Sequence, residues 1–217
     1  MSKENNLGHL RKSYEKGALD DSLKRVSPIA LFEQWFSEAE AHPAIEEANA
    51  MSIVTLGEDQ FPKARVVLLK QFSEEGFVFY TNYASEKGKA LLAYPQVGIS
   101  FFWPALERQV IVKGTAEKVA PEVSDAYFSS RPLGSQLGAI ASAQSEVIAS
   151  RAVLEDRLAA LEKEYHSSSP KRPDHWGGVL VRPVAIEFWQ GRPNRLHDRL
   201  NFRLTSSDTW SAQRLSP

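Results

Sequence analysis

Two arginines and a histidine near the C-terminus are well suited to chemistry on an anionic substrate. Arg195, His197 and Arg199 occupy alternate positions, so on a regular strand their side chains would share one face. Two guanidinium groups beside an imidazole repel one another unless an anion lies on that face. A surface strand paired to acidic neighbours accounts for the pattern equally well, and the residues alone leave both interpretations open.

A second candidate segment is an apolar strand with a cation at each end, running from Arg65 to Lys70 (RVVLLK). Such a strand could hold a flat apolar ligand along its backbone and an anion at its ends. Positions five apart point to opposite faces of a regular strand, so Arg65 and Lys70 would need a bulge, a strand end or two separate subsites. The alternative is a core strand whose charged ends reach solvent.

Two further segments could bind phosphate. Residues 81–89 (TNYASEKGK) form a hydroxyl-rich turn that opens a helix, and the free N–H groups and dipole of a helix N-terminus favour an anion. An ordinary capped surface helix is the alternative. Tyr127, Arg131 and Ser135 are spaced by four residues, and they share a face if the segment stays helical through Pro132. Charge-assisted hydrogen bonds contribute about 1.5–3 kcal/mol each, so three could hold a small phosphorylated ligand.

Glu107-Arg108-Gln109 forms another polar cluster at the entrance of a predicted strand. Metal chemistry is not indicated, because the chain has no cysteine and its five histidines show no local ligand spacing. A formal net charge of −1 gives no reason to expect nucleic acid or an anionic membrane as partner. The polar N-terminal segment contains no apolar stretch of a signal peptide, so a cytoplasmic location is expected.

The elements that must position these residues are short strands and amphipathic helices, which do not alternate strictly along the chain. Ser27 and Pro28 are an N-cap and a first helical residue, and the apolar stripe that follows predicts a helix ending at His42-Pro43. Strands are predicted at 51–56, 63–72, 77–81, 97–103, 108–119, 178–189, 195–204 and 209–215, and further helices at 85–94, 121–130 and 150–165.

This order predicts an α+β fold with a mainly antiparallel sheet of at least seven strands, closed as a barrel with helices outside it. Neither a G-x-G-x-x-G nor a P-loop motif occurs, which removes the usual dinucleotide and nucleotide-triphosphate readings. Residues 1–25 are charged and poor in apolar side chains, and we expect a mobile arm there. Residues 26–217 are expected to form a single domain.

Taken together, the segments resemble the pyridoxamine 5′-phosphate oxidases. The likeness runs from about His9 to Pro217 and includes many matches in order. The matching segments are RVVLLK, FYTN, SEKGK, LERQV, YFSSRP, GSQLGA, AQS, WGG, EFWQG, RLHDR and RLSP.

This resemblance implies an FMN-binding split β-barrel and a homodimer with FMN at the subunit interface. The implied FMN contacts are Arg65, Val66, Val67, Leu68, Leu69, Lys70, Tyr80, Thr81, Lys87, Gln109, Gln144, Ser145, Trp189 and Arg199. The implied substrate contacts are Arg11, Tyr14, Lys70, Tyr127, Arg131, Ser135, Arg195 and His197. Among these, Arg195 and His197 would lie over the pyridine ring as catalytic residues, and the segment from Arg11 to Tyr14 would close on the ligand.

The activity implied is oxidation of pyridoxamine 5′-phosphate or pyridoxine 5′-phosphate to pyridoxal 5′-phosphate, with O₂ as acceptor and hydrogen peroxide as product. Two alternatives stay open: another split-barrel FMN oxidoreductase, and a non-enzymatic carrier of FMN or pyridoxal phosphate. One position departs from the family pattern, because Ser85-Glu86-Lys87 stands where Ser-Arg-Lys is usual. A carboxylate there either points away from the FMN phosphate or weakens its binding.

Overall fold

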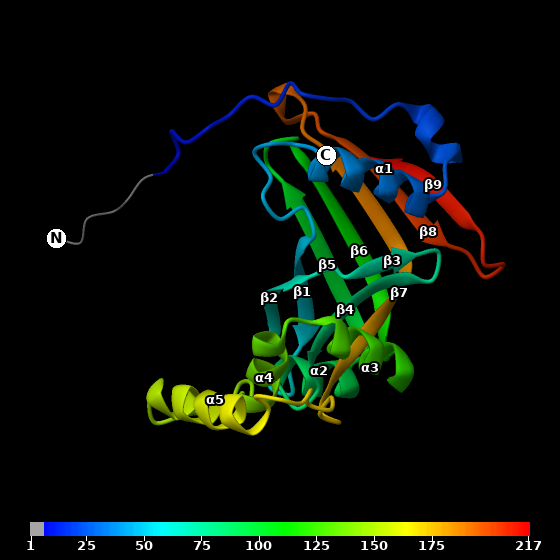
Figure 1. Cartoon of the computed structure of the whole chain (residues 1–217). Helices are drawn as coiled ribbons and strands as arrows, with labels where there is room; N and C mark the ends of the chain where they lie inside the picture. The colour runs from blue at the N-terminus through cyan, green and yellow to red at the C-terminus, as the bar shows by residue number, and fades with distance from the viewer. Residues whose placement is uncertain (1–6) are drawn as a thin grey trace. The chain divides into compact units, whose positions relative to one another are not determined.

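A computed structural model describes residues 7–217, which form two compact units, each built from separate stretches of chain. Unit 1 comprises residues up to Ala48 together with Phe101–Ile111 and Ala185–Pro217, and unit 2 comprises Asn49–Ser100 and Val112–Val184. Figure 1 shows the helices and strands along the chain. The expected boundary at residue 25, between an arm and a single domain, stays a prediction.

Unit 2 is built on an antiparallel sheet. The strand order is β2-β1-β5-β6-β7-β4-β3. Its strands are β1 (Ala50–Leu56), β2 (Pro62–Leu68), β3 (Gln71–Ser73), β4 (Gly76–Asn82) and parts of β5 (Gln96–Trp103), β6 (Arg108–Lys118) and β7 (Trp176–Gln190). Its helices are α2 (Glu86–Ala93), α3 (Pro121–Ser130), α4 (Leu133–Ala141) and α5 (Ala152–Glu164).

Unit 1 contains η1 (Asp21–Arg25), α1 (Pro28–Glu40), η2 (Pro193–Arg195), β8 (Asp198–Leu204) and β9 (Trp210–Leu215), together with the remaining parts of β5, β6 and β7. Helix α1 begins as predicted, because the Ser27 hydroxyl accepts a hydrogen bond from the Ile29 N–H at 3.2 Å. Its buried stripe carries aromatic side chains into the core. The Trp35 ring meets Phe188 of β7 edge-on, with 5.2 Å between centroids.

The predicted α+β class with a mainly antiparallel sheet is confirmed, but the structure differs from the predictions at three places: two strands have other bounds, and one helix was not predicted. The strand expected at 63–72 ends at Leu68, after which the Lys70 N–H donates to the Val78 carbonyl at 2.9 Å. A separate helix, α4, follows Pro132, which lies at its N-cap with an extended ψ of 141°. The chain between Tyr127 and Ser135 is therefore not one continuous helix.

The third correction concerns the strand predicted at 195–204, which begins only at Asp198. Residues 193–195 form a 3₁₀ turn in which Asn194 and Arg195 take positive φ values of 56° and 62°. Arg195, His197 and Arg199 therefore do not lie on one face of a strand. Within residues 7–217, no helix combines the length and the apolar character needed to cross a bilayer.

Candidate functional site

Unit 2 holds a cavity of about 280 Å³, which we call the cationic pocket. Three of its lining side chains are cations and none is an acid, so its chemistry suits an anion. The lining residues are Val66, Val67, Leu68, Lys70, Tyr80, Thr81, Asn82, Lys87, Tyr127, Arg131, Gln144 and Trp176. Ten of these, all except Asn82 and Trp176, are in the predicted FMN or substrate sets.

Lys87 is the most buried cation of this pocket, at 8% exposure. It lies in the first turn of α2, whose N-cap Ser85 accepts a hydrogen bond from the Gly88 N–H at 3.2 Å. The Lys87 ammonium donates to the Thr81 hydroxyl at 3.1 Å. Burial, followed by the nearby positive charge of Arg65, lowers the pKa of Lys87. An anion in the pocket would offset both effects.

Arg131 enters the same pocket from the turn between α3 and α4. Its guanidinium carbon lies 4.7 Å from the centre of the Trp176 ring, a cation–π distance. One of its nitrogens, Nη1, is buried without a hydrogen-bond partner, and burial lowers the pKa of Arg131. A buried guanidinium N–H without an acceptor is costly. This orphaned donor indicates an anionic ligand in the cationic pocket.

A stack of aromatic rings forms one wall of the cationic pocket. Tyr80 of β4 and Tyr127 of α3 are stacked with 3.8 Å between ring centroids. Trp176 of β7 lies 5.4 Å from Tyr80 in nearly the same plane orientation. Sequence reasoning missed Trp176 as a site residue, although WGG was among the segments of the resemblance. Only the fold shows that its indole lies beside Arg131.

Several residues predicted for FMN or substrate in this unit are outside the lining of the cationic pocket. Arg65 donates to the hydroxyl of Thr55 and to the Lys63 carbonyl, the latter at 2.9 Å. Ser145 has a positive φ of 75° and accepts a hydrogen bond from the Glu86 N–H at 3.2 Å. The remaining two are Leu69, which is buried, and Ser135, which is exposed near the start of α4.

Glu86, the position that departs from the family pattern, is paired with a lysine. Its carboxylate receives hydrogen bonds from the Lys63 ammonium at 2.6 and 2.8 Å. Both side chains are about half exposed, at 57% and 49%. The partner neutralises the carboxylate locally, so Glu86 need not act as an unpaired negative charge.

Unit 1 holds a second cavity, of about 610 Å³, which we call the aromatic pocket. Its lining brings together five predicted residues: Arg11, Tyr14, Trp189, Arg195 and His197. The other lining residues are Leu10, Lys12, Ser13, Arg192 and Asn194. The structure therefore brings these five predicted residues together around one cavity, although Arg195 and His197 do not lie on the strand predicted for them.

Three rings form the wall of the aromatic pocket. Trp189 and His197 lie 4.7 Å apart between centroids, and Tyr14 meets them edge-on at 5.7 and 5.6 Å. The Nδ1 atom of His197 accepts a hydrogen bond from the Arg192 N–H at 3.1 Å. In the neutral ring, the proton is therefore on Nε2. Arg195 is exposed on the η2 turn.

Arg199 and Gln109 also belong to unit 1 but do not line the aromatic pocket. The Arg199 guanidinium donates to the Glu187 carboxylate at 2.7 Å and to the Ser216 carbonyl at 2.8 Å. The hydrogen bond to Glu187 raises the pKa of Arg199. For Arg199, this acidic neighbour agrees with the alternative interpretation of a surface strand paired to acidic residues.

Two models of one protein family match the chain over most of its length. A model described as pyridoxamine 5′-phosphate oxidase matches residues 37–164, and one described as the pyridoxine 5′-phosphate oxidase C-terminal dimerisation region matches residues 176–217. Among solved structures, PhzG from Burkholderia lata 383 has a TM-score of 0.86 at 24% identity, over 95% of this chain and 100% of that one. This likeness shows the split-barrel fold.

Curated relatives extend the match across nearly the whole chain. The pyridoxine/pyridoxamine 5′-phosphate oxidase of Flavobacterium psychrophilum is 54% identical over 97% of this chain and 99% of its own length. That of Flavobacterium johnsoniae is 56% identical, with coverage of 98% and 99%. The chain belongs to the pyridoxine/pyridoxamine 5′-phosphate oxidase family.

Proposed function

We propose that this protein oxidises pyridoxamine 5′-phosphate or pyridoxine 5′-phosphate to pyridoxal 5′-phosphate, using FMN and O₂ and releasing hydrogen peroxide. With the amine substrate, water hydrolyses the resulting imine to the aldehyde and ammonia. The observation that carries the proposal is the cationic pocket, in which Arg131 keeps a buried N–H without an acceptor. FMN carries a phosphate, and so do the substrates in the name of this family. Membership of the family supports the choice among phosphorylated ligands.

The residues of unit 2 fit the phosphates of such ligands. Lys87, at the N-terminus of α2, would hold the FMN phosphate together with Thr81. Lys70 and Arg131 would hold the substrate phosphate, with Tyr127 adding a hydroxyl donor. Because Lys70 lies beyond the end of β2, the pleat does not fix its side chain to the face opposite Arg65.

Residues of unit 1 would orient the reacting end of the substrate. Arg195 would bind the amine or hydroxyl to be oxidised, and His197 would hold the pyridine ring with Trp189 and Tyr14 beside it. Bound FMN would supply the redox chemistry, as acceptor of a hydride from the substrate's C4′ carbon and as donor of electrons to O₂. The protein's own contribution is orientation of the substrate. Orientation can lower an activation barrier by at most about 7–11 kcal/mol.

We also propose a homodimer with FMN at the subunit interface. The match of residues 176–217 to a dimerisation region supports it. A measured mass of twice 24.3 kDa in solution would agree with the dimer, and a monomeric mass with FMN bound would contradict it. The cytoplasmic location stays a prediction.

The test is to load the purified protein with FMN, add pyridoxamine 5′-phosphate and measure hydrogen peroxide and pyridoxal 5′-phosphate. We expect both products in equal amounts. Bound FMN without peroxide would favour the carrier alternative. Turnover with another reductant but not with this substrate would favour a different split-barrel oxidoreductase. A protein that retains no FMN would refute both oxidoreductase proposals and leave only a carrier of pyridoxal phosphate.

A further inference from the structure

Glu107 is a buried carboxylate that the proposed chemistry does not use. Its side chain is 2% exposed and lies in the turn between β5 and β6. The residue has a positive φ of 56°, a conformation that costs energy for any residue other than glycine. Such a strained backbone conformation persists only where the surrounding contacts hold it in place.

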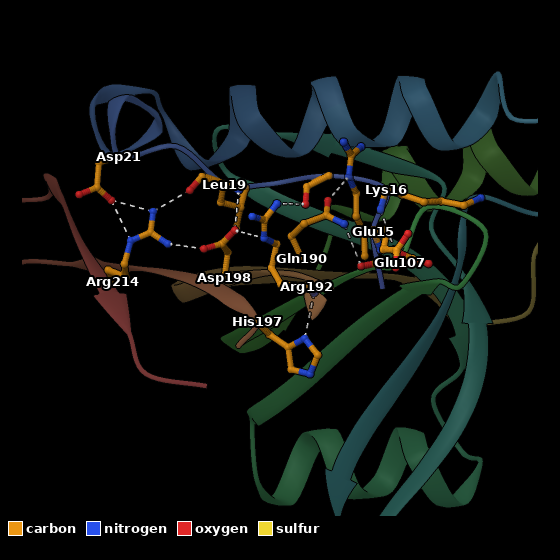
Figure 2. A network of polar contacts seen from close by, with 12 residues as sticks. Glu15, Lys16, Leu19, Asp21, Glu107, Gln190, Arg192, His197, Asp198 and Arg214 are labelled. Atoms are coloured by element: carbon orange, nitrogen blue, oxygen red, sulfur yellow. Dashed lines mark hydrogen bonds and ion pairs between the residues drawn. The ribbon is translucent and has the colours of Figure 1, made fainter. Parts of the chain in front are cut away.

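Among residues 7–217, the partners of this carboxylate are all in the N-terminal segment, at residues 12–16. One oxygen, Oε2, accepts hydrogen bonds from the backbone N–H groups of Glu15 at 2.8 Å and Lys16 at 3.0 Å. The other, Oε1, lies 3.1 Å from the Lys12 ammonium. Burial alone would raise the pKa of Glu107, but these donors outweigh it and the pKa is lowered. Figure 2 shows Glu107 beneath Glu15 and Lys16.

The turn that carries Glu107 is also hydrogen-bonded to the end of β7, which fixes its position. The Glu107 carbonyl accepts the Gly191 N–H at 2.8 Å and the Gln190 side-chain amide at 3.2 Å. Gln190 is 1% exposed. The segment passes directly over it, since a Cβ added at Gly17 would come within 2.8 Å of the Gln190 side-chain oxygen.

Farther along, the segment is held by charged groups at a second point. The Arg192 guanidinium donates to the Gly17 carbonyl at 2.8 Å, and that of Arg214 donates to the Leu19 carbonyl at 2.6 Å. Arg214 also meets the Asp198 carboxylate at 2.8 Å. In Figure 2, Arg214 and Leu19 lie toward the opposite end of the network from Glu107. Glu107 is thus the anchor next to Tyr14.

Tyr14 directly precedes the two backbone groups that Glu107 holds, and it lies in the wall of the aromatic pocket. Its ring leaves no room for a side chain at Gly191, where an added Cβ would be 2.7 Å from the Tyr14 Cγ. We infer that Glu107 is a positioning residue, which fixes the N-terminal segment through the amides of residues 15 and 16. It thereby holds the Tyr14 ring in the wall of the aromatic pocket. This inference rests on the proposed function for the identity of the ligand.

The experiment compares Glu107→Ala and Glu107→Gln in the FMN-loaded protein. The amide of glutamine can still accept from both backbone N–H groups but loses the ion pair with Lys12. We expect KM for pyridoxamine 5′-phosphate to rise about tenfold in the alanine variant, with a smaller rise in the glutamine variant. The turnover number should change by less than about twofold, because a lost wall of the pocket removes uniform binding. FMN content should not change.

A double-variant cycle separates positioning of Tyr14 from a merely structural role. If Glu107 acts through Tyr14, adding Glu107→Ala to Tyr14→Ala should raise KM by less than about twofold further. Full additivity of the two changes would overturn the inference. Glu117→Gln serves as the matched control, because it removes a carboxylate that is half exposed and paired only with Arg182 among the contacts of the described chain.

Hydrogen exchange without substrate gives a readout that does not depend on activity. In the wild-type protein the amides of Glu15 and Lys16 should exchange slowly. In Glu107→Ala their exchange rates should rise about tenfold or more. Unchanged exchange would overturn the inference. A wild-type protein that makes no peroxide would refute the proposed function, whereas exchange at these two amides would still decide whether Glu107 anchors the segment.

Discussion

The cationic pocket and the aromatic pocket differ in size and in the kind of side chain that forms their walls. The cationic pocket gathers Lys70, Lys87 and Arg131 around a cavity of about 280 Å³ and leaves a buried donor unsatisfied. The aromatic pocket is larger, at about 610 Å³, and packs Tyr14 and Trp189 against His197. In the proposed function, the first holds phosphate and the second holds and orients a ring. Variants in the two pockets should therefore fail in different kinetic parameters.

The largest effect is expected in the aromatic pocket. Arg195→Ala should reduce the turnover number by about a hundredfold or more, because it removes the group proposed to position the reacting amine or hydroxyl. FMN content should stay near that of the wild type. Steady-state peroxide release, together with flavin absorbance, measures both. Arg203→Ala, at an exposed position of β8, is the matched control. Near-normal turnover would remove Arg195 from the catalytic residues.

In the cationic pocket, Arg131→Met should act on substrate binding instead. Loss of one or two charge-assisted hydrogen bonds to phosphate should raise KM by about ten- to a hundredfold. The preference for the phosphorylated substrate over free pyridoxamine should shrink by the same factor. Arg182→Met removes a guanidinium that is half exposed on β7 and provides the control. A rise in KM for both substrates alike would contradict a phosphate role.

Lys87→Met should weaken FMN rather than substrate, by about tenfold, since one buried charge-assisted hydrogen bond is lost. FMN titration followed by fluorescence measures the dissociation constant. Because the pKa of Lys87 is lowered, its charge is lost at a lower pH than the usual 10.5 for lysine. As the pH is raised, FMN affinity of the wild type should therefore begin to fall before pH 10.5 is reached. The variant should not show this fall. Lys89→Met, on the exposed side of the same helix, is the control.

The smallest effect is expected at Glu86. Glu86→Arg should tighten FMN by a few-fold at most, because an added cation near a phosphate gains little at a half-exposed position. Lys63→Met should weaken FMN slightly, since it leaves the Glu86 carboxylate without its partner at 2.6 Å. An FMN dissociation constant that is unchanged or larger in Glu86→Arg would count against the prediction.

The sequence predicted the elements well where hydrophobic period and capping agree. Helix α1 begins after Ser27 and Pro28 as expected, and β6 buries Val110 and Val112 on one face while Lys113 is exposed. It failed where positive φ values break the pattern, as at Arg195, because no residue-type rule places an arginine in that conformation. The break after Leu68 was equally hidden, since Leu69 and Lys70 continue an apolar strand pattern.

What the sequence determined by itself is the chemistry of the side chains and the family. The order of its motifs named Lys87, Arg131, Arg195 and His197 without any coordinates. What only the tertiary structure decided is which groups meet across long stretches of chain. Glu107 meets the amides of residues 15 and 16 only because the fold brings the two segments together and excludes water from the carboxylate. Burial and the pairing of backbone donors are properties of the packed chain, so no local pattern could have revealed this anchor.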